Sequence, residues 1–235
     1  PQPNCNDWEC EFDTFSLNVD VATDTPPTWQ FALGVINLES NPGYTVVFSS
    51  IQEVQPAADG EYVVPGSTVY LVNAVRTAEA PISKMLPDGT AAVEIDVSVA
   101  GNSRWAAMNI RTTVSMVAGI THFNVLVEIE DYVWVSDELL TNLQLEMDIG
   151  GDGGISVSYS TVVVGSGYLQ SNLYAKANST TDGVQVLPVS MQYNDNAYAS
   201  ISRFSGSLAT EFVLGINSPS DPAVYPSSLT PVSGQ

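Results

Sequence analysis

The sequence contains very few basic residues. Lysine and arginine together number 6 in 235 residues, against 26 aspartates and glutamates, so the formal net charge is −20 at pH 7. The first basic residue is Arg76, and every charged side chain before it is acidic. A surface of this charge repels phosphate backbones and anionic lipid headgroups. We therefore expect no direct binding of nucleic acid.

Long apolar runs are also lacking. No window reaches the roughly 18 apolar residues that a membrane-spanning helix needs, and the N-terminus has no basic and apolar leader. We therefore expect no insertion into a membrane. The chain begins with Pro1 and ends with Gln235, which suggests excision from a longer precursor. The alternative is a chain boundary without functional meaning.

Histidine is nearly absent, and this limits the chemistry that the chain can perform. A hydrolase whose nucleophile is activated by imidazole would have to use His122, the single histidine. The same scarcity argues against histidine-based metal centres. No glycine-rich loop is followed by Lys-Ser or Lys-Thr, as a phosphate-binding loop requires. We therefore expect a protein that is not an enzyme.

Acidic side chains leave one enzymatic alternative open. A glycosidase needs only two carboxyl groups about 5 to 9.5 Å apart. Glu94 with Asp96, and Glu128 with Glu130, are spaced as neighbours on one face of a strand. The same spacing occurs on an ordinary solvated face, so a catalytic pair and a charged surface are both compatible with it.

The two cysteines, Cys5 and Cys10, lie close together near the N-terminus. A disulfide between them would close a very small loop, so it would fix a local hairpin without holding the whole fold. Free thiols are the main alternative. A metal site would need a second pair of cysteine or histidine ligands, which the sequence does not offer nearby.

Alternation of apolar and polar residues is abundant and predicts strands along the whole chain. It is clearest over residues 93–99, 125–130, 143–147 and 155–160, where every second residue is apolar. Further β-branched or aromatic runs occupy residues 15–21, 29–38, 44–51, 68–75, 104–117, 161–164, 168–175, 184–193 and 198–216. Only residues 77–86 and 136–142 have patterns compatible with a helical turn or two. We therefore predict an all-β fold, an antiparallel β-sandwich of jelly-roll type.

Turn residues separate these runs without dividing the chain into domains. Breakers such as Asn41-Pro42-Gly43 and Pro87-Asp88-Gly89 fall between the runs, and no internal linker interrupts them. We predict one β-sandwich domain over residues 15–216. Residues 1–14 and 217–235 are polar, contain several prolines, and are predicted to be extended arms. Solvated tails are the alternative for both ends.

Two local motifs predict ligand or modification sites. Asp148 and Asp152 lie in the glycine-rich segment 148–154, where carboxylate and carbonyl oxygens could bind Ca²⁺. A plain glycine-rich turn is the alternative for this segment, and Ca²⁺ is the only cofactor that the sequence suggests. Asn178, in Asn178-Ser179-Thr180, is a glycosylation acceptor if the chain is secreted.

The predicted architecture and the two ends resemble a known family. A nearly all-β chain with polar arms at both ends and a terminal glutamine is similar to the coat proteins of picornavirus-like capsids, which are jelly rolls cleaved from a polyprotein. The resemblance covers residues 15–216 and both ends, and it includes no diagnostic motif. It implies a capsid subunit that assembles with copies of itself or related subunits in a virion.

Two other functions are compatible with the same sequence. An extracellular filament or pilus-like subunit could donate an acidic N-terminal strand to the open sheet edge of a neighbour. A secreted carbohydrate-binding or adhesion module could instead use Ca²⁺ at residues 148–154. All three interpretations place the protein in a virion or at an extracellular surface.

Overall fold

A computed structural model describes 48–58, 60–71, 73–75, 77, 79–115, 122–147, 181, 183–184 and 198–213 in full. For the other residues that it assigns to strands or to a helical turn, it describes the backbone only. All statements about side chains below concern the fully described residues.

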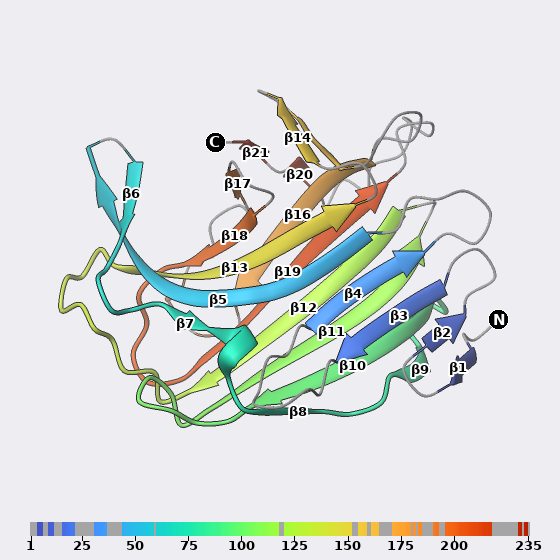
Figure 1. Ribbon diagram of the computed structural model, residues 1–235, viewed down its shortest axis with the longest axis horizontal. Coiled ribbons are helices and arrows are strands. Elements are labelled where there is room, and N and C mark those ends of the chain that lie inside the picture. Colours follow the sequence, from blue (N-terminus) through green and yellow to red (C-terminus); the bar gives the residue numbers. More distant parts are fainter. Residues whose placement is uncertain are drawn as a thin grey trace.

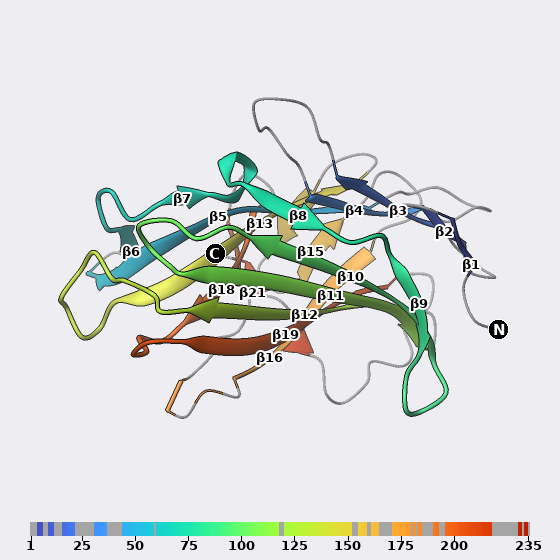
Figure 2. The ribbon, with the colours of Figure 1, turned by 90° about the horizontal axis from the view of Figure 1, so that it is seen from below.

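Two β-sheets packed face to face make up the described structure (Figures 1 and 2). Every strand pair is antiparallel except the short pair of β17 and β21. The predicted all-β sandwich is therefore confirmed. Sheet A contains β1 (Asn4–Asn6), β2 (Glu9–Glu11), β3 (Ser16–Val21), β4 (Phe31–Ile36), β5 (Tyr44–Ala57), β6 (Gly60–Val63), β7 (Val69–Tyr70), β13 (Asn142–Gly151), β17 (Ser190–Gln192), β18 (Asn196–Ile201) and β21 (Ser233–Gly234).

Sheet B is built around a meander of three long strands, with β10 next to β11 and β11 next to β12. The partner of β12 on its other side is β19, which is distant in sequence. The jelly-roll subtype stays a prediction. Sheet B contains β8 (Arg76–Ala78), β9 (Ile82–Met85), β10 (Ala91–Val99), β11 (Ala107–Val117), β12 (Ile120–Glu130), β14 (Ile155–Ser158), β15 (Thr161–Val164), β16 (Ser171–Ser179), β19 (Leu208–Asn217) and β20 (Thr230–Pro231).

The core lies between the two sheets and follows the predicted alternation. Buried side chains from β10 and β12 of sheet B face buried side chains from β13 of sheet A. Their intervening neighbours point to the outer faces, as the period of two requires, and all of them except Leu126 are polar. The buried members include Val93, Ile95, Val97, Val99, Phe123, Val125, Val127, Ile129, Leu143, Leu145 and Met147.

A β-bulge in β5 changes this alternation once. Glu146 of β13 pairs with Ser50, whereas Met147 pairs with Phe48, so Ser49 is an extra residue without a partner in the register. Phe48 and Ile51 are therefore both in the core, although they are three residues apart. The bulge lets both halves of this 14-residue strand face the same core.

Three local expectations differ from the structure. Residues 77–86, whose pattern allowed a helical turn or two, contain the end of β8 and the whole of β9, which both pair with β10. Residues 136–142, whose pattern also allowed a helical turn, form an irregular loop and turn before β13. Residues 68–75, predicted as a strand, contain β7 and then the 3-10 turn η1 (Leu71–Asn73).

The run 198–216 was predicted as one strand and is two. It is divided into β18 and β19 by a tight turn between them. Gly206 in this turn has a φ of 73°, in the left-handed region that glycine adopts without steric cost. The glycine thus ends a sequence that is otherwise typical of a continuous strand.

The two predicted arms include strands of sheets A and B. Residues 1–14 contain β1 and β2, which extend sheet A through β3, and residues 217–235 contain β20 and β21. The remaining residues of both segments lie outside the described residues, so the arm assignments stay predictions. Among the described residues there is no helix long and apolar enough to cross a membrane.

Candidate functional site

The loop between β12 and β13, residues 131–141, lies at one end of the sandwich (Figures 1 and 2). Asp131 turns the chain out of β12 with a φ of 52°, a conformation that aspartate tolerates better than most residues. The amide of Tyr132 donates to the carbonyl of Gly206 at 2.9 Å, and the amide of Val133 donates to the carbonyl of Arg104 at 2.7 Å. Backbone hydrogen bonds thus connect this loop to two neighbouring loops.

A buried carboxylate fixes the next part of the loop. Glu53 of β5 has no exposed surface. Its Oε1 accepts hydrogen bonds from the Val135 amide at 2.7 Å and the Tyr132 hydroxyl at 3.3 Å, and its Oε2 accepts one from the Ser136 amide at 3.0 Å. The backbone of Glu53 is also held, because its amide donates to Ser67 Oγ at 3.0 Å. The side chain therefore ties β5 to a loop about 80 residues further along the chain.

The surroundings of Glu53 favour hydrogen bonding over ion pairing. In the described part of the chain, the ion pairs are those of Lys84 and Arg111, and neither involves Glu53. A buried carboxylate is costly unless donors replace its hydration, and two amides and one hydroxyl do so here. Burial, together with the negative charge of Glu53, raises the pKa of Tyr132, so this hydroxyl stays protonated and donates.

Aromatic packing stabilises the same loop from the other side. The rings of Tyr132 and Trp134 meet edge to face at 5.0 Å, and Phe204 completes the cluster at 5.3 Å from Trp134. Arg203 lies over the Trp134 ring at 4.6 Å and donates to the carbonyls of Ser136 at 2.8 Å and Glu138 at 3.1 Å. Polar and aromatic contacts together leave the loop backbone little freedom.

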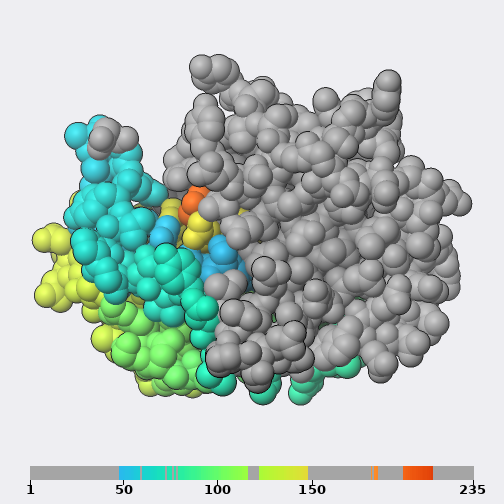
Figure 3. Space-filling view, viewed as in Figure 1, coloured from blue at the N-terminus to red at the C-terminus, as the bar shows by residue number. Residues whose placement is uncertain are grey.

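This well-held loop exposes large apolar side chains to solvent. Leu139 is 83% exposed, Leu140 is 73% exposed and Val133 is 55% exposed. The β5–β6 hairpin lies beside the loop and adds the exposed side chains of Tyr62 and Val63 (Figures 1, 2 and 3). We call these five residues the end surface. Several exposed apolar side chains on two neighbouring segments make this end of the sandwich a candidate interaction site.

The hairpin is connected to the loop by a chain of polar contacts. The Tyr62 hydroxyl donates to Gln55 Oε1, and Gln55 Nε2 donates to Thr141 Oγ1 at 2.9 Å. Thr141 in turn donates to Ser136 Oγ at 3.0 Å. These contacts connect the two parts of the end surface.

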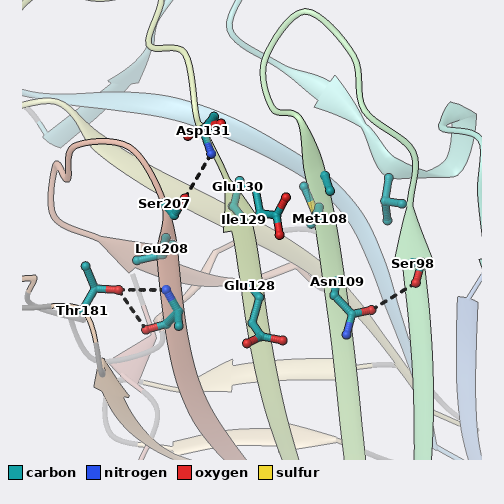
Figure 4. A pocket seen from close by; sticks show the side chains of 13 residues that line it. Ser98, Met108, Asn109, Glu128, Ile129, Glu130, Asp131, Thr181, Ser207 and Leu208 are labelled. Carbon is teal, nitrogen blue, oxygen red and sulfur yellow. Dashed lines mark hydrogen bonds between the residues drawn. The ribbon is translucent and has the colours of Figure 1, made fainter.

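A separate depression of about 560 Å³ opens on sheet B (Figure 4). Its lining includes the predicted carboxylates Glu128 and Glu130, which are both exposed, and Asp131. Asn109 lies beside them and accepts a hydrogen bond from Ser98 at 3.5 Å. Among the described residues, no three histidine, cysteine, aspartate or glutamate side chains converge as a metal site would require.

The other predicted carboxylate pair is engaged in ion pairs. Glu94 pairs with Lys84, and Asp96 pairs with Arg111 at 2.9 Å, all on the outer face of sheet B. The hydrogen bond from Arg111 to Asp96 is the main reason why the pKa of Arg111 is raised. Each of these carboxylates has its own cation, an arrangement typical of a charged sheet surface.

His122 lies on β12 and is half-buried. In the register it is opposite Ser115 on one side and Gly215 on the other. Its Nε2 is buried and has no hydrogen-bond partner among the described residues. Burial lowers the pKa of His122, so the imidazole is neutral at pH 7.

The remaining predicted site residues lie where only the backbone is described, or outside the description. Cys5 and Cys10 are directly opposite each other in the β1–β2 register, the arrangement that a local disulfide needs. Asp148 lies on β13 opposite Val47, and Asn178 lies on β16 opposite Glu211. Asp152 lies outside the described residues. The disulfide, the Ca²⁺ site and the glycosylation site stay predictions.

The sequence analysis missed the residues that organise the end surface. The strand was predicted to end at Ile51, so Glu53 was left outside it, whereas β5 continues to Ala57. The alternation of side chains along a strand could have identified Glu53, since it is two residues from Ile51 and therefore lies on the same core-facing side. The exposed leucines gave no signal, because they lie in a segment whose pattern allowed a helical turn.

Comparison of the chain with protein-family models and with curated proteins gives no match.

Proposed function

We propose that this chain is a non-catalytic structural subunit that associates with copies of itself, as the coat-protein resemblance implies. The end surface is the observation that carries the proposal. Leu139 and Leu140 are exposed on a loop whose backbone is fixed by Glu53 and Arg203, so they cannot turn inward for burial in their own chain. Contact with a second copy would remove them from water.

The charge of the chain sets the conditions for this association. Copies that each have a net charge of −20 repel one another in dilute buffer. Salt screens this repulsion, and divalent cations can also bridge carboxylates, so association should strengthen with either. The hydrophobic contribution of the end surface is not weakened by salt.

A pair of leucine substitutions tests the role of the end surface. In Leu139→Ser with Leu140→Ser, the apolar side chains are lost but the loop hydrogen bonds are kept. We expect the self-association constant to fall at least about tenfold at high ionic strength, because each buried leucine is worth roughly 1.5–3 kcal/mol. Sedimentation equilibrium over a range of concentrations measures this constant.

The control is Ile82→Ser with Met85→Ser, which removes two apolar side chains from β9 that are each about half exposed. The control should associate as the unchanged chain does. An unchanged chain that stays monomeric at every concentration and salt level would refute the proposal. Equal association of both double variants would instead place the contact elsewhere on the molecule.

The form of the assembly separates the capsid from the filament. Electron micrographs of the associated chain should show closed shells for a capsid subunit and fibres for a filament subunit. Deletion of residues 1–14 then tests the predicted N-terminal arm. If the arm binds a neighbouring copy, the truncated chain should lose assembly and keep its β-sheet circular dichroism spectrum.

A further inference from the structure

Polar side chains form two rows across the outer face of sheet A. The first row runs through Tyr70, Ser50, Glu146 and Tyr198, which are successive partners in the registers of β7, β5, β13 and β18. These residues alternate along their strands with core residues such as Ile51 and Leu145, so they lie on the face away from the core.

Hydrogen bonds connect the members of this first row. Ser50 Oγ donates to Glu146 Oε2, and the Tyr198 hydroxyl donates to Glu146 Oε1 at 3.2 Å. Both carboxylate oxygens of Glu146 are thus hydrogen-bonded acceptors. At one end of the row, Tyr70 has 57% of its surface exposed.

The second row lies two residues further along the strands, about 7 Å from the first. Gln52 Nε2 donates to Gln144 Oε1 at 2.8 Å, and Gln144 Nε2 donates to Ser200 Oγ at 3.3 Å. Thr68 Oγ1 donates to Gln52 Oε1 at 3.5 Å. The Glu61 carboxylate accepts from Gln144 at 3.4 Å, so the β5–β6 hairpin reaches over this row.

The rows form a recessed and ordered floor. Although they face outward, Ser50 is fully buried, Gln144 is 3% exposed and Ser200 is 6% exposed. In Figure 3, parts of β5, β13 and β18 lie at the bottom of a hollow beside the hairpin and β7. Half-buried Gln52 and exposed Tyr70 are the members that a ligand in this hollow could contact first.

We propose that Gln52 and Tyr70, the accessible members of these two rows, bind a neutral glycan chain above the buried members. Amide and hydroxyl groups offer both donors and acceptors, which is what the hydroxyls of a sugar require. The exposed ring of Tyr70 offers an apolar surface for the C–H face of a pyranose, and its hydroxyl keeps a polar end. The floor is already ordered by its own hydrogen bonds, so binding would cost little further side-chain entropy.

The charge of the site selects against acidic glycans. Among the fully described residues, Glu146 and Glu61 are the charged groups that hydrogen-bond to the rows, and both are acidic. A uronate, sulfate or phosphate group would be repelled there. The proposal also needs no Ca²⁺, which distinguishes it from a calcium-dependent carbohydrate site at residues 148–154.

Titration calorimetry of the full chain with soluble hexasaccharides tests the proposal. The probes are the neutral hexasaccharides of β-1,4-glucose, β-1,3-glucose, β-1,4-mannose and β-1,4-xylose, and the acidic hexasaccharide of galacturonic acid. We expect at least one neutral probe to bind with a Kd of about 1 mM or tighter. The acidic probe should not bind, and EDTA should leave the affinity unchanged.

Three variants locate the site on the rows. Tyr70→Ala and Gln52→Ala should each weaken the neutral glycan at least about tenfold, which corresponds to about 1.4 kcal/mol. Ile82→Ala is the control, because Ile82 is a comparably exposed side chain at 54% that lies on β9 of sheet B, outside the rows, and it should leave the affinity unchanged. Circular dichroism confirms that each variant is folded.

The following results would overturn the proposal: no neutral probe bound at millimolar concentration, equal binding of the acidic probe, or loss of binding in EDTA. Affinity unchanged by both Tyr70→Ala and Gln52→Ala would also overturn it. None of these results bears on self-association through the end surface, which is measured without glycan.

Discussion

Carboxylates are held in two different ways at the end of the sandwich and on the outer face of sheet B. Glu53 is completely buried, and its described hydrogen-bond donors are two amides and a hydroxyl. Asp96 is partly exposed and has the Arg111 guanidinium as its partner. An ion pair is therefore a poor guide to which carboxylate stabilises this fold, because solvent weakens the exposed pair.

The largest effect in this comparison is expected from Glu53→Ala. The substitution leaves the Val135 and Ser136 amides and the Tyr132 hydroxyl without their acceptor, and unpaired buried donors cost roughly 1–3 kcal/mol each. We expect the free energy of unfolding to fall by about 3 kcal/mol or more. Urea denaturation measures it, with Glu53→Gln as the control that retains one acceptor and loses less. A loss below about 1 kcal/mol for Glu53→Ala would contradict the comparison.

For Tyr132→Phe at neutral pH we expect a smaller loss in the free energy of unfolding, about 1 kcal/mol, because one hydrogen bond is lost. Its pH dependence is more informative. Because the pKa of Tyr132 is raised in the folded state, the unfolded chain loses this proton first as pH rises above about 10. The stabilisation is therefore complete below that pH and is lost above it, by about 1.4 kcal/mol per pH unit.

Alkaline urea titrations of both proteins measure this difference. The unchanged chain should lose stability faster than Tyr132→Phe above pH 10, so the difference between the two proteins should shrink. Parallel curves would show that Tyr132 ionises equally in the folded and unfolded states.

On the outer face of sheet B, Arg111→Ala should cost less than about 1 kcal/mol, since Arg111 and Asp96 side chains are 38% and 29% exposed. A double-mutant cycle with Asp96→Ala isolates the coupling between the two side chains. We expect this coupling to decrease when salt is added, because the pair is screened. A coupling energy as large as the loss of unfolding free energy in Glu53→Ala would contradict the expected difference between the exposed and the buried carboxylate.

The smallest effect is expected at His122, which is half-buried and has no ion pair with any of the described residues. Burial lowers the pKa of this imidazole, so protonation is harder in the folded state than in the unfolded state. The stabilisation is present above the unfolded pKa of about 6.5 and is lost as pH falls through the folded pKa. An NMR titration should give a midpoint below 6.5, and a midpoint at or above that value would show that burial does not dominate.

The sequence predicts those parts of the fold that depend on local periodicity. Strands β10, β12 and β13 were found because every second residue is apolar, and a strand buried on one side requires this. The loop 136–142 was not predicted, because its local pattern allowed a helical turn. Its conformation is set instead by Glu53, 83 residues before Ser136, and no window of sequence contains both.

The sequence allowed a prediction of which chemical groups are available, but not of where the candidate sites lie. The scarcity of basic residues and histidine can be counted, and the alternation places Glu94 and Asp96 on one face. Their pairing with Lys84 and Arg111 depends on the strand register and was not predicted. The two polar rows could not be predicted, because they exist only in the register that places Gln52 beside Gln144 and Ser200. That register depends on pairings between strands about 90 and 56 residues apart.

The bulge in β5 determines where this strand could be shortened. Ser49 is the extra residue, so removing it would restore strict alternation and leave both Phe48 and Ile51 facing the core. Ser50 is also a serine, so its deletion gives the same chain. Deletion of any residue from Ile51 to Val54 would instead turn one half of the strand over, exposing core side chains and burying polar ones. Position 49 is therefore where natural or engineered variants of this chain can differ in length without inverting a strand.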